Sequence, residues 1–333
     1  MSRRAILKIT IALCTILVCL LMLEGFARIV IGRGTMHLGV EMWKYAKDVK
    51  LRSPNPEIGH RHRPNAHRFL MGVDVQTDSL GLRDVERSLE KPAGTERIVV
   101  LGDSITFGWG VPFESTFCHL LEKSLNANPP VPGRKFEVVN TGVGNSNTAM
   151  EVAYLKEEGW KLQPDLILVG WFINDAEPTP KPSENWFAYH SYAFVWLDSA
   201  IDGMMRNTKA RQSYTDYYRG LYDDAQPGWP KCRRAFADLA AFCEKHKVPC
   251  RILLIPELHT IGPGYEFKDI HDEIRALCAQ VKLPTLELLD AFPELGDPHQ
   301  YWVCPGDAHP NARGNELMAA KIDHALREGK WLP

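Results

Sequence analysis

From residue 97 onward, short apolar runs alternate with segments of helical length. The runs are RIVVLG (97–102), FEVVNTGV (136–143), DLILVGWF (165–172), RILLIP (251–256) and LPTLELL (283–289). The helix-length segments lie near 115–127, 148–161, 231–247, 267–281 and 312–328. Apolar, β-branched strands that alternate with helices are typical of a parallel sheet covered by helices on both faces. The sequence therefore predicts one α/β domain over residues 96–333.

One interval within this domain breaks the alternation. Residues 176–229 are rich in aromatic side chains, namely Trp186, Phe187, Tyr189, Tyr192, Phe194, Trp196, Tyr214, Tyr217, Tyr218, Tyr222 and Trp229. The interval follows the carboxyl end of a predicted strand, where active-site loops gather, and long insertions of this kind tend to be functional. We expect it to form an accessory helix, with some rings on the core and others facing a substrate.

The N-terminus carries a separate apolar run. Residues 5–23 (AILKITIALCTILVCLLML) contain one charge, Lys8. As a helix rising ~1.5 Å per residue, the run spans about 28 Å, roughly the hydrocarbon core of a bilayer. We predict a single-pass membrane anchor within residues 1–27. A cleaved secretory signal, with small residues at 25–27, is the alternative, and both would export the rest of the chain.

Residues 28–95 connect this run to the α/β domain. We expect a juxtamembrane stalk followed by a small β-hairpin, because apolar residues alternate at Met71, Val73 and Val75 before turn signals near Gly81. The same segment carries interleaved basic residues, His60, Arg61, His62, Arg63, His67 and Arg68. Because no carboxylate completes a metal-ligand set there, we expect these side chains to be solvated.

Composition excludes several classes of function. The formal net charge is −2, with no basic excess to suggest nucleic-acid binding. The chain has no phosphate-binding G-x-x-x-x-G-K-[ST] loop, no complete dinucleotide fingerprint and no Cys/His zinc spacing. We therefore expect neither a cofactor nor a metal. Six of the eight cysteines lie outside the N-terminal run, and whether they form disulfides, and with which pairing, stays open.

The sequence Gly-Asp-Ser ends the first predicted strand and places Ser104 at the rim of the sheet, where ligands bind in open α/β folds. Thr106 replaces the second glycine of G-x-S-x-G, so the α/β-hydrolase elbow is a poor match. A serine nucleophile needs a base to take its proton. His309, in Asp-Ala-His-Pro before the last helix, is the best candidate, and His259 is second. Asp307 is placed to orient His309 as the acid of a triad.

Groups that stabilise an oxyanion are expected at the ends of the same strands. The backbone amide of Ser104, the turn at Gly144 and Asn145, and the side-chain amide of Asn174 all follow predicted strands. Amide donors at such positions stabilise the negative charge of a tetrahedral intermediate. The residues together supply a nucleophile, a base, an orienting acid and oxyanion donors.

These blocks resemble those of the SGNH (GDSL-type) hydrolases, whose Ser, Gly, Asn and His fall on Ser104, the turn at 144–145, Asn174 and His309. The likeness covers residues 97–328, and the N-terminal run is similar to that of membrane-anchored bacterial members. It implies a three-layer α/β/α, flavodoxin-like fold and metal-free ester hydrolysis through an acyl-enzyme. The family glycine falls on Asn145, with Gly144 one place earlier. The family aspartate falls on Gly306, which leaves triad and dyad both open.

The sequence thus predicts an exported, membrane-tethered serine esterase acting on small-molecule, glycan or lipid esters. One alternative is an O-acyltransferase that passes the acyl group to a sugar hydroxyl, suggested by the aromatic insertion. Another is a tethered binding protein that has lost catalysis, for which Asn145 is the only support.

Overall fold

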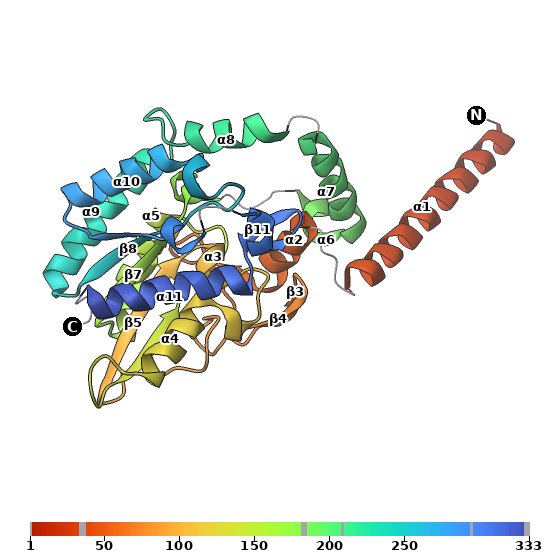
Figure 1. Cartoon of the computed structure of the whole chain (residues 1–333). Coiled ribbons are helices and arrows are strands. Elements are labelled where there is room, and N and C mark those ends of the chain that lie inside the picture. Colours follow the sequence, from red (N-terminus) through yellow and green to blue (C-terminus); the bar gives the residue numbers. More distant parts are fainter. Residues whose placement is uncertain (1, 33–37, 181–184, 208–209, 294–295, 330–333) are drawn as a thin grey trace.

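Five parallel strands form the central sheet of the computed structural model, which describes residues 2–32, 38–180, 185–207, 210–293 and 296–329 (Figure 1). The strands are β5 (Thr95–Gly102), β6 (Lys135–Asn140), β7 (Leu166–Trp171), β8 (Cys250–Leu254) and β9 (Thr285–Glu287). Their order across the sheet is β6-β5-β7-β8-β9, with all neighbours parallel. Numbered within the sheet this is 2-1-3-4-5, the flavodoxin-like order. The predicted fold class is confirmed.

Helices cover both faces of this sheet. One face carries α5 (Thr148–Glu157), α9 (Trp229–His246) and α10 (Lys268–Gln280), and the other carries α4 (Phe117–Ala127) and α11 (Ala312–Glu328). Side chains alternate between the faces, as strand geometry requires: Val99 and Leu101 pack toward the first set, and Ile98 and Val100 toward the second. These helices and strands lie within a few residues of the predicted ranges.

The segment between the N-terminal run and the sheet is not an isolated stalk. It forms α2 (Leu38–Asp48), β1 (Lys50–Arg52), β2 (His60–His62), β3 (His67–Leu70) and β4 (Val73–Gln76). The expected hairpin is β3 with β4, and β1 pairs with β2. Apolar side chains of this segment are buried against the domain in one cluster of Tyr45, Val49, Leu70, Met71 and Val75 with Phe107 and Trp109. Burial of this apolar surface explains why the segment docks.

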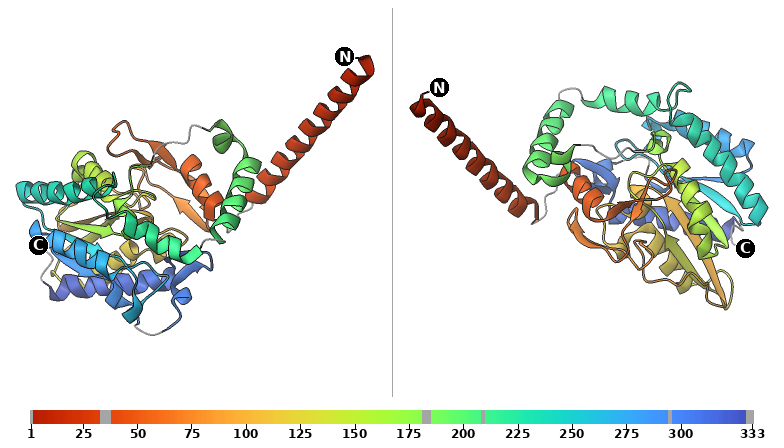
Figure 2. Two further views of the ribbon diagram at one scale, coloured as in Figure 1. Left: turned by 90° about the horizontal axis from the view of Figure 1, so that it is seen from above. Right: turned by 180° about the vertical axis from the view of Figure 1, so that it is seen from behind.

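The N-terminal run is a helix, α1 (Arg3–Gly32), that continues five residues past the predicted end at 27. It is the only helix among the described residues that is both long and apolar enough to cross a membrane. It projects away from the rest of the chain (Figure 1). The C-terminal end of α1 (residues 24–32), which we call its foot, lies beside the aromatic insertion in all three views (Figures 1 and 2).

The insertion forms α6 (Trp186–His190), α7 (Tyr192–Asn207) and α8 (Ala210–Gly220). As expected, some of its rings pack on the core, including Tyr214, Tyr218 and Tyr222. Others on α6 and α7 are exposed. All eight cysteines lie among the described residues, and each is a free thiol.

One buried side chain ties the two helices of the second face to the C-terminal strand. Asn315 accepts a hydrogen bond from the Phe117 amide at 2.9 Å and donates to the carbonyls of Pro310 and Asn311, both at 2.9 Å. We expect Asn315→Ala to lower Tm by roughly 4–10 °C, because buried polar groups lose their partners. Scanning fluorimetry in detergent measures the shift. Glu316→Ala, at the exposed neighbouring position, is the matched control, and an equal Tm for both variants would contradict the argument.

Candidate active site

Ser104 lies at the carboxyl end of β5, as the first residue of the short helix α3 (Ser104–Phe107). The strand order reverses between β5 and β7, which is where ligands bind in folds of this type. Backbone from both neighbouring strands approaches α3 closely. A Cβ on Gly142 would lie 2.4 Å from the Phe107 nitrogen, and one on Gly170 would lie 2.6 Å from the Thr106 hydroxyl oxygen. Only glycine fits at these positions.

A chain of hydrogen bonds joins Ser104, His309 and Asp307. The Ser104 Oγ lies 2.8 Å from Nε2 of His309, and Nδ1 of His309 lies 2.5 Å from Oδ1 of Asp307. His309 and Asp307 both lie on β11 (Asp307–Pro310), which pairs with β10 (Trp302–Cys304). The other carboxylate oxygen of Asp307 accepts the Trp109 indole N–H at 3.0 Å. The structure therefore brings these three expected residues together with the connectivity of a triad.

Charge and burial act in opposite directions on this pair. Burial disfavours a charged His309 ring, but the charge and hydrogen bond of Asp307, with smaller contributions from Asp103 and Glu257, outweigh it and raise the pKa of His309. Burial would raise the pKa of Asp307, yet the charge and hydrogen bonds of His309, together with the Trp109 indole, lower it. Asp307 is thus held as a carboxylate beside a ring that binds a proton more readily than a free histidine.

Asn174 follows β7 and lies beside the nucleophile. Its Nδ2 donates to Oδ2 of Asp103 at 3.2 Å, and the Ser104 hydroxyl lies 3.4 Å from the same oxygen. Asp103 also accepts the Ile105 amide at 2.9 Å and so caps α3. Burial raises the pKa of Asp103. The Asn174 amide carries two hydrogens, and the bond to Asp103 uses one of them.

The turn after β6 differs from expectation in one respect. The amide of Gly144 donates to the Tyr45 hydroxyl at 2.8 Å, so it is not available to an oxyanion as we had expected. Asn145 is exposed, with φ +61°, a left-handed conformation that asparagine tolerates better than most residues. Its amide has no acceptor within the described parts of the chain. Of the two amides in this turn, only that of Asn145 is left to bind a ligand.

The segment before the sheet holds this turn from behind, which sequence reasoning did not anticipate. The Gly144 carbonyl accepts the Lys50 ammonium at 3.0 Å and lies 3.0 Å from Nε2 of His60. The Tyr45 hydroxyl that receives the Gly144 amide lies 2.6 Å from Nε2 of His62. Both polar groups of Gly144 are therefore fixed by α2, β1 and β2.

His60 and His62 are consequently not solvated, and our expectation for them was wrong. His62 is 3% exposed. Burial, with the nearby Lys50 charge, lowers the pKa of each of these histidines to about 3, and burial lowers the pKa of Lys50 to about 7. The sequence offered one signal: His60 and His62 are two residues apart, and side chains two apart on a strand share a face. That spacing does not tell whether the shared face is solvated or packed on the domain.

The alternative base, His259, lies in a different environment. Its Nδ1 hydrogen-bonds the buried carboxylate of Glu257, and its ring lies between Tyr214 and Trp302, at 4.9 and 4.7 Å between centroids. Ser104 contacts His309 instead. Within the described ranges, no group of three or more His, Cys, Asp or Glu side chains is arranged to hold a metal ion.

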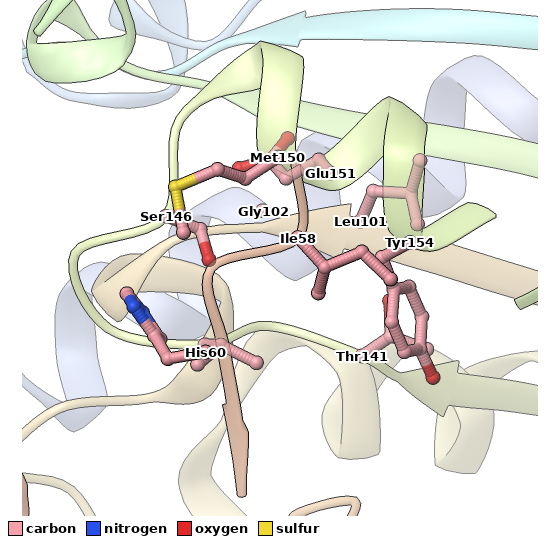
Figure 3. A pocket seen from close by; sticks show the side chains of 10 residues that line it. Ile58, His60, Leu101, Gly102, Thr141, Ser146, Met150, Glu151 and Tyr154 are labelled. Carbon is pink, nitrogen blue, oxygen red and sulfur yellow. The ribbon is translucent and has the colours of Figure 1, made fainter. Parts of the chain in front are cut away.

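A small cavity lies behind the turn, lined by side chains that include Ile58, His60, Met150, Glu151 and Tyr154 (Figure 3). Its volume is about 10 Å³, at the lower limit for one water molecule. The buried Glu151 carboxyl at its edge has no hydrogen-bond partner in the described structure. Burial, together with the charges of Asp175 and Asp103, raises its pKa well above the usual range. The cavity is too small for an acyl group.

The serine hydroxyl is hydrogen-bonded to a histidine, which is in turn hydrogen-bonded to a carboxylate, and the three lie at the switch point of a parallel sheet. This arrangement defines the class of serine-dependent acyl hydrolases. The chain belongs to the GDSL-like Lipase/Acylhydrolase family, whose model matches residues 100–317. This confirms the family that the motifs resemble. The protein is therefore an esterase or acylhydrolase, a serine hydrolase acting on esters.

Three solved structures illustrate the similarity of fold. TesA is 17% identical, with TM-score 0.44, over 70% of this chain and 98% of that one. A catalytic mutant of the acetylxylan esterase Axe2 from Geobacillus stearothermophilus is 14% identical, with TM-score 0.45, over 72% and 96%. A two-domain esterase (CEX) active on acetylated mannans is 16% identical, with TM-score 0.46, over 72% and 52%. A search of curated protein sequences finds no match.

The electrostatics of the His309–Asp307 pair give a direct prediction. We expect the pKa of His309, measured by NMR titration of its ring, to lie above the ordinary histidine value of about 6.5 and to fall in Asp307→Asn, because the variant loses the carboxylate charge. The control is Asp297→Asn. Asp297 and His299 have the same spacing and the same 2.5 Å contact but are exposed. A His309 titration that is identical in wild type and Asp307→Asn would refute the assignment.

Proposed function

We propose that this protein is an exported, membrane-tethered serine esterase that forms an acyl-enzyme on Ser104. The observation that carries the proposal is the 2.8 Å contact between the Ser104 hydroxyl and Nε2 of His309, with Asp307 on the opposite ring nitrogen. The Ser104 oxygen attacks the ester carbonyl while His309 takes its proton. Collapse of the tetrahedral intermediate breaks the bond to the alcohol, which leaves with the proton from His309. Water then releases the acid by the same steps, and Ser104 regains its proton.

Three groups would stabilise the intermediate. They are the Ser104 amide, the Asn145 amide and the second hydrogen of the Asn174 side chain. They follow β5, β6 and β7, which are neighbours in the sheet. Loss of one such donor typically costs about 3 kcal/mol of barrier. Because only neutral His309 accepts a proton, activity should fall as the pH drops through the raised pKa of this ring.

The foot of α1 supports an uncleaved anchor over a cleaved signal. Ala27 and Ile31 are 3% and 0% exposed and pack in one cluster with Val40 of α2 and Val195 of α7. A signal peptide removed during export would not be expected to contribute to the core of the mature protein. An 18-residue apolar stretch of α1, with a mean hydropathy of 2.7, has none of its residues buried. We infer that α1 stays attached and that the remaining domain lies outside the cytoplasm.

The contacts of Tyr45 and Lys50 with Gly144 support a proposal for the domain boundaries. We propose that residues 96–333 form the catalytic domain and that residues 28–95, expected as a stalk and hairpin, belong to it functionally through Tyr45 and Lys50. The segment 176–229 is retained as an insertion within it.

The surroundings of His259 favour a second candidate, an O-acyltransferase. A histidine held by a buried carboxylate and flanked by two aromatic rings suits a sugar hydroxyl, with the rings stacking on the sugar. Product analysis with and without an oligosaccharide acceptor distinguishes the two candidates, and free acid alone in both reactions excludes transfer. The complete series of hydrogen bonds from Ser104 through His309 to Asp307 argues against a binding protein that has lost catalysis.

The test of the proposed nucleophile uses the full-length protein in detergent. We expect Ser104→Ala to abolish turnover of p-nitrophenyl acetate and butyrate and to abolish labelling by a fluorophosphonate probe, because the attacking oxygen is gone. Ser88→Ala, at an exposed serine whose hydroxyl bonds the Glu90 carbonyl, should retain both. Turnover that persists in folded Ser104→Ala would sink the assignment.

The support of the turn gives a separate expectation. Tyr45→Phe keeps the ring that contacts Phe107 and Trp109 but removes the acceptor of the Gly144 amide. We expect kcat to fall roughly tenfold, since a loss of about 1.4 kcal/mol in the placement of the Asn145 donor has that effect. KM should change little, whereas Tm should fall by a few degrees, because the buried Gly144 amide and the His62 ring lose their shared partner. A fall in Tm with kcat unchanged would show that Tyr45 is structural only.

A further inference from the structure

Large apolar side chains are exposed on α6 and α7. Trp186 and Phe187 of α6 are 62% and 58% exposed, and four more residues of the two helices are exposed, namely Tyr189, Trp196, Leu197 and Ile201. Soluble surfaces rarely carry such a concentration, and contiguous patches of this kind mark sites of contact. We call these six residues the aromatic patch.

The aromatic patch is fixed to the foot of α1. Glu24 of α1 caps the N-terminus of α7, accepting hydrogen bonds from the Ser191 hydroxyl at 2.8 Å and from the Ala193 and Tyr192 amides at 3.0 and 3.1 Å. Arg28 lies 4.7 Å from the centre of the Tyr192 ring and donates to a carbonyl of α6 at 3.2 Å. These contacts set the position of α6 and α7 relative to the helix that would cross the membrane.

The level of α7 along α1 follows from these contacts. The apolar run of α1 ends at residue 23, and the next residue, Glu24, is the one that caps α7. The start of α7 therefore lies where α1 would leave the hydrocarbon. Past Glu24, on the side of α1 toward its C-terminus, Phe26 and Ile29 are also exposed apolar residues. Exposed apolar residues are therefore present both on α1 and on α6 and α7, and α1 and α7 lie side by side (Figure 2).

The chemistry of the aromatic patch matches the bilayer interface. Tryptophan and tyrosine gather at this depth in membrane proteins, because their rings are apolar and their N–H and O–H groups stay hydrated. On α7, Leu197 and Ile201 are four residues apart and share one helical face, whereas Val195 is buried in the cluster with α1. Over residues 192–201, where its side chains are described, α7 thus has one face packed on the protein and one face exposed.

We propose that α6 and α7 lie in the interfacial layer of the same membrane that α1 crosses, as a second lipid contact. The inference rests on the proposed tether. The contact orients the domain, because a single helix leaves the tilt of the domain against the membrane plane free, whereas a second contact restricts it. The insertion then continues into α8, where Tyr214 and Tyr217 bond Glu257 and Glu177 at 3.2 and 3.0 Å. The insertion therefore links the lipid surface to Glu257, whose charge contributes to the raised pKa of His309.

The experiment uses the full chain in nanodiscs of phosphatidylcholine, with and without bromine near the top of one acyl chain. We expect brominated lipid to quench tryptophan emission, and Trp186→Phe with Trp196→Phe to lose most of that quenching. Trp160→Phe is the matched control, because Trp160 packs on Phe242 and His246 away from α1. In Leu197→Asp with Ile201→Asp, quenching of the remaining Trp186 and Trp196 should fall, since charge disfavours the contact.

Two results would overturn the proposal. In one, the double tryptophan variant loses no lipid quenching while soluble acrylamide quenches Trp186 and Trp196 strongly, which places the aromatic patch in water. In the other, neither agent quenches these residues and cross-linking captures dimers, which places a second copy on the patch. Fluorophosphonate labelling of Ser104 in every variant is scored separately. Its absence throughout would count against the esterase and not against the lipid contact.

Discussion

The close approach of three backbone segments around α3 is the constraint on which the site depends. Glycine at 142 and at 170 lets the strands on either side of β5 come within contact of the turn that carries Ser104. With a side chain at either position, α3 would have to move away from its neighbours. The segments after β6 and β7, which carry the oxyanion donors that we propose, would then shift relative to the serine hydroxyl. Backbone proximity therefore places the nucleophile, and the polar side chains act within that arrangement.

Much of this was predictable from the sequence, for a definite reason. Buried parallel strands are continuous apolar runs, so they are visible without a structure, and the carboxyl ends of such strands share one edge of the sheet. That reasoning brought Ser104, Asn174 and His309 to one place. It could not find Tyr45 and Lys50, because their partner Gly144 is 99 and 94 residues away in sequence. No local pattern encodes a docking contact of that length, and the same limit made buried His60 and His62 look like a solvated edge.

The orienting acid shows what spacing alone can and cannot decide. Asp297 and His299 repeat the Asp-x-His spacing of Asp307 and His309, with the same contact between carboxylate and ring. Both are exposed, and no hydrogen bond joins His299 to a serine in the described structure. The spacing is therefore enough to form the pair. The pair of Asp307 and His309 becomes part of a site for three reasons. It is buried, the Trp109 indole bonds its carboxylate, and Ser104 contacts the ring nitrogen of His309 that Asp307 leaves free.

The docking of residues 38–62 behind Gly144 bears on how a soluble form of this protein is designed. A natural choice is to begin the chain at residue 53, after the apolar run and the expected stalk. That truncation deletes Tyr45 and Lys50, so the Gly144 amide loses its acceptor and the Gly144 carbonyl keeps only its contact with His60. Such a fragment retains Ser104, His309 and Asp307, but its turn is no longer held. If such a shortened protein shows no esterase activity, the cause would be the lost support of the turn and not the absence of catalytic residues.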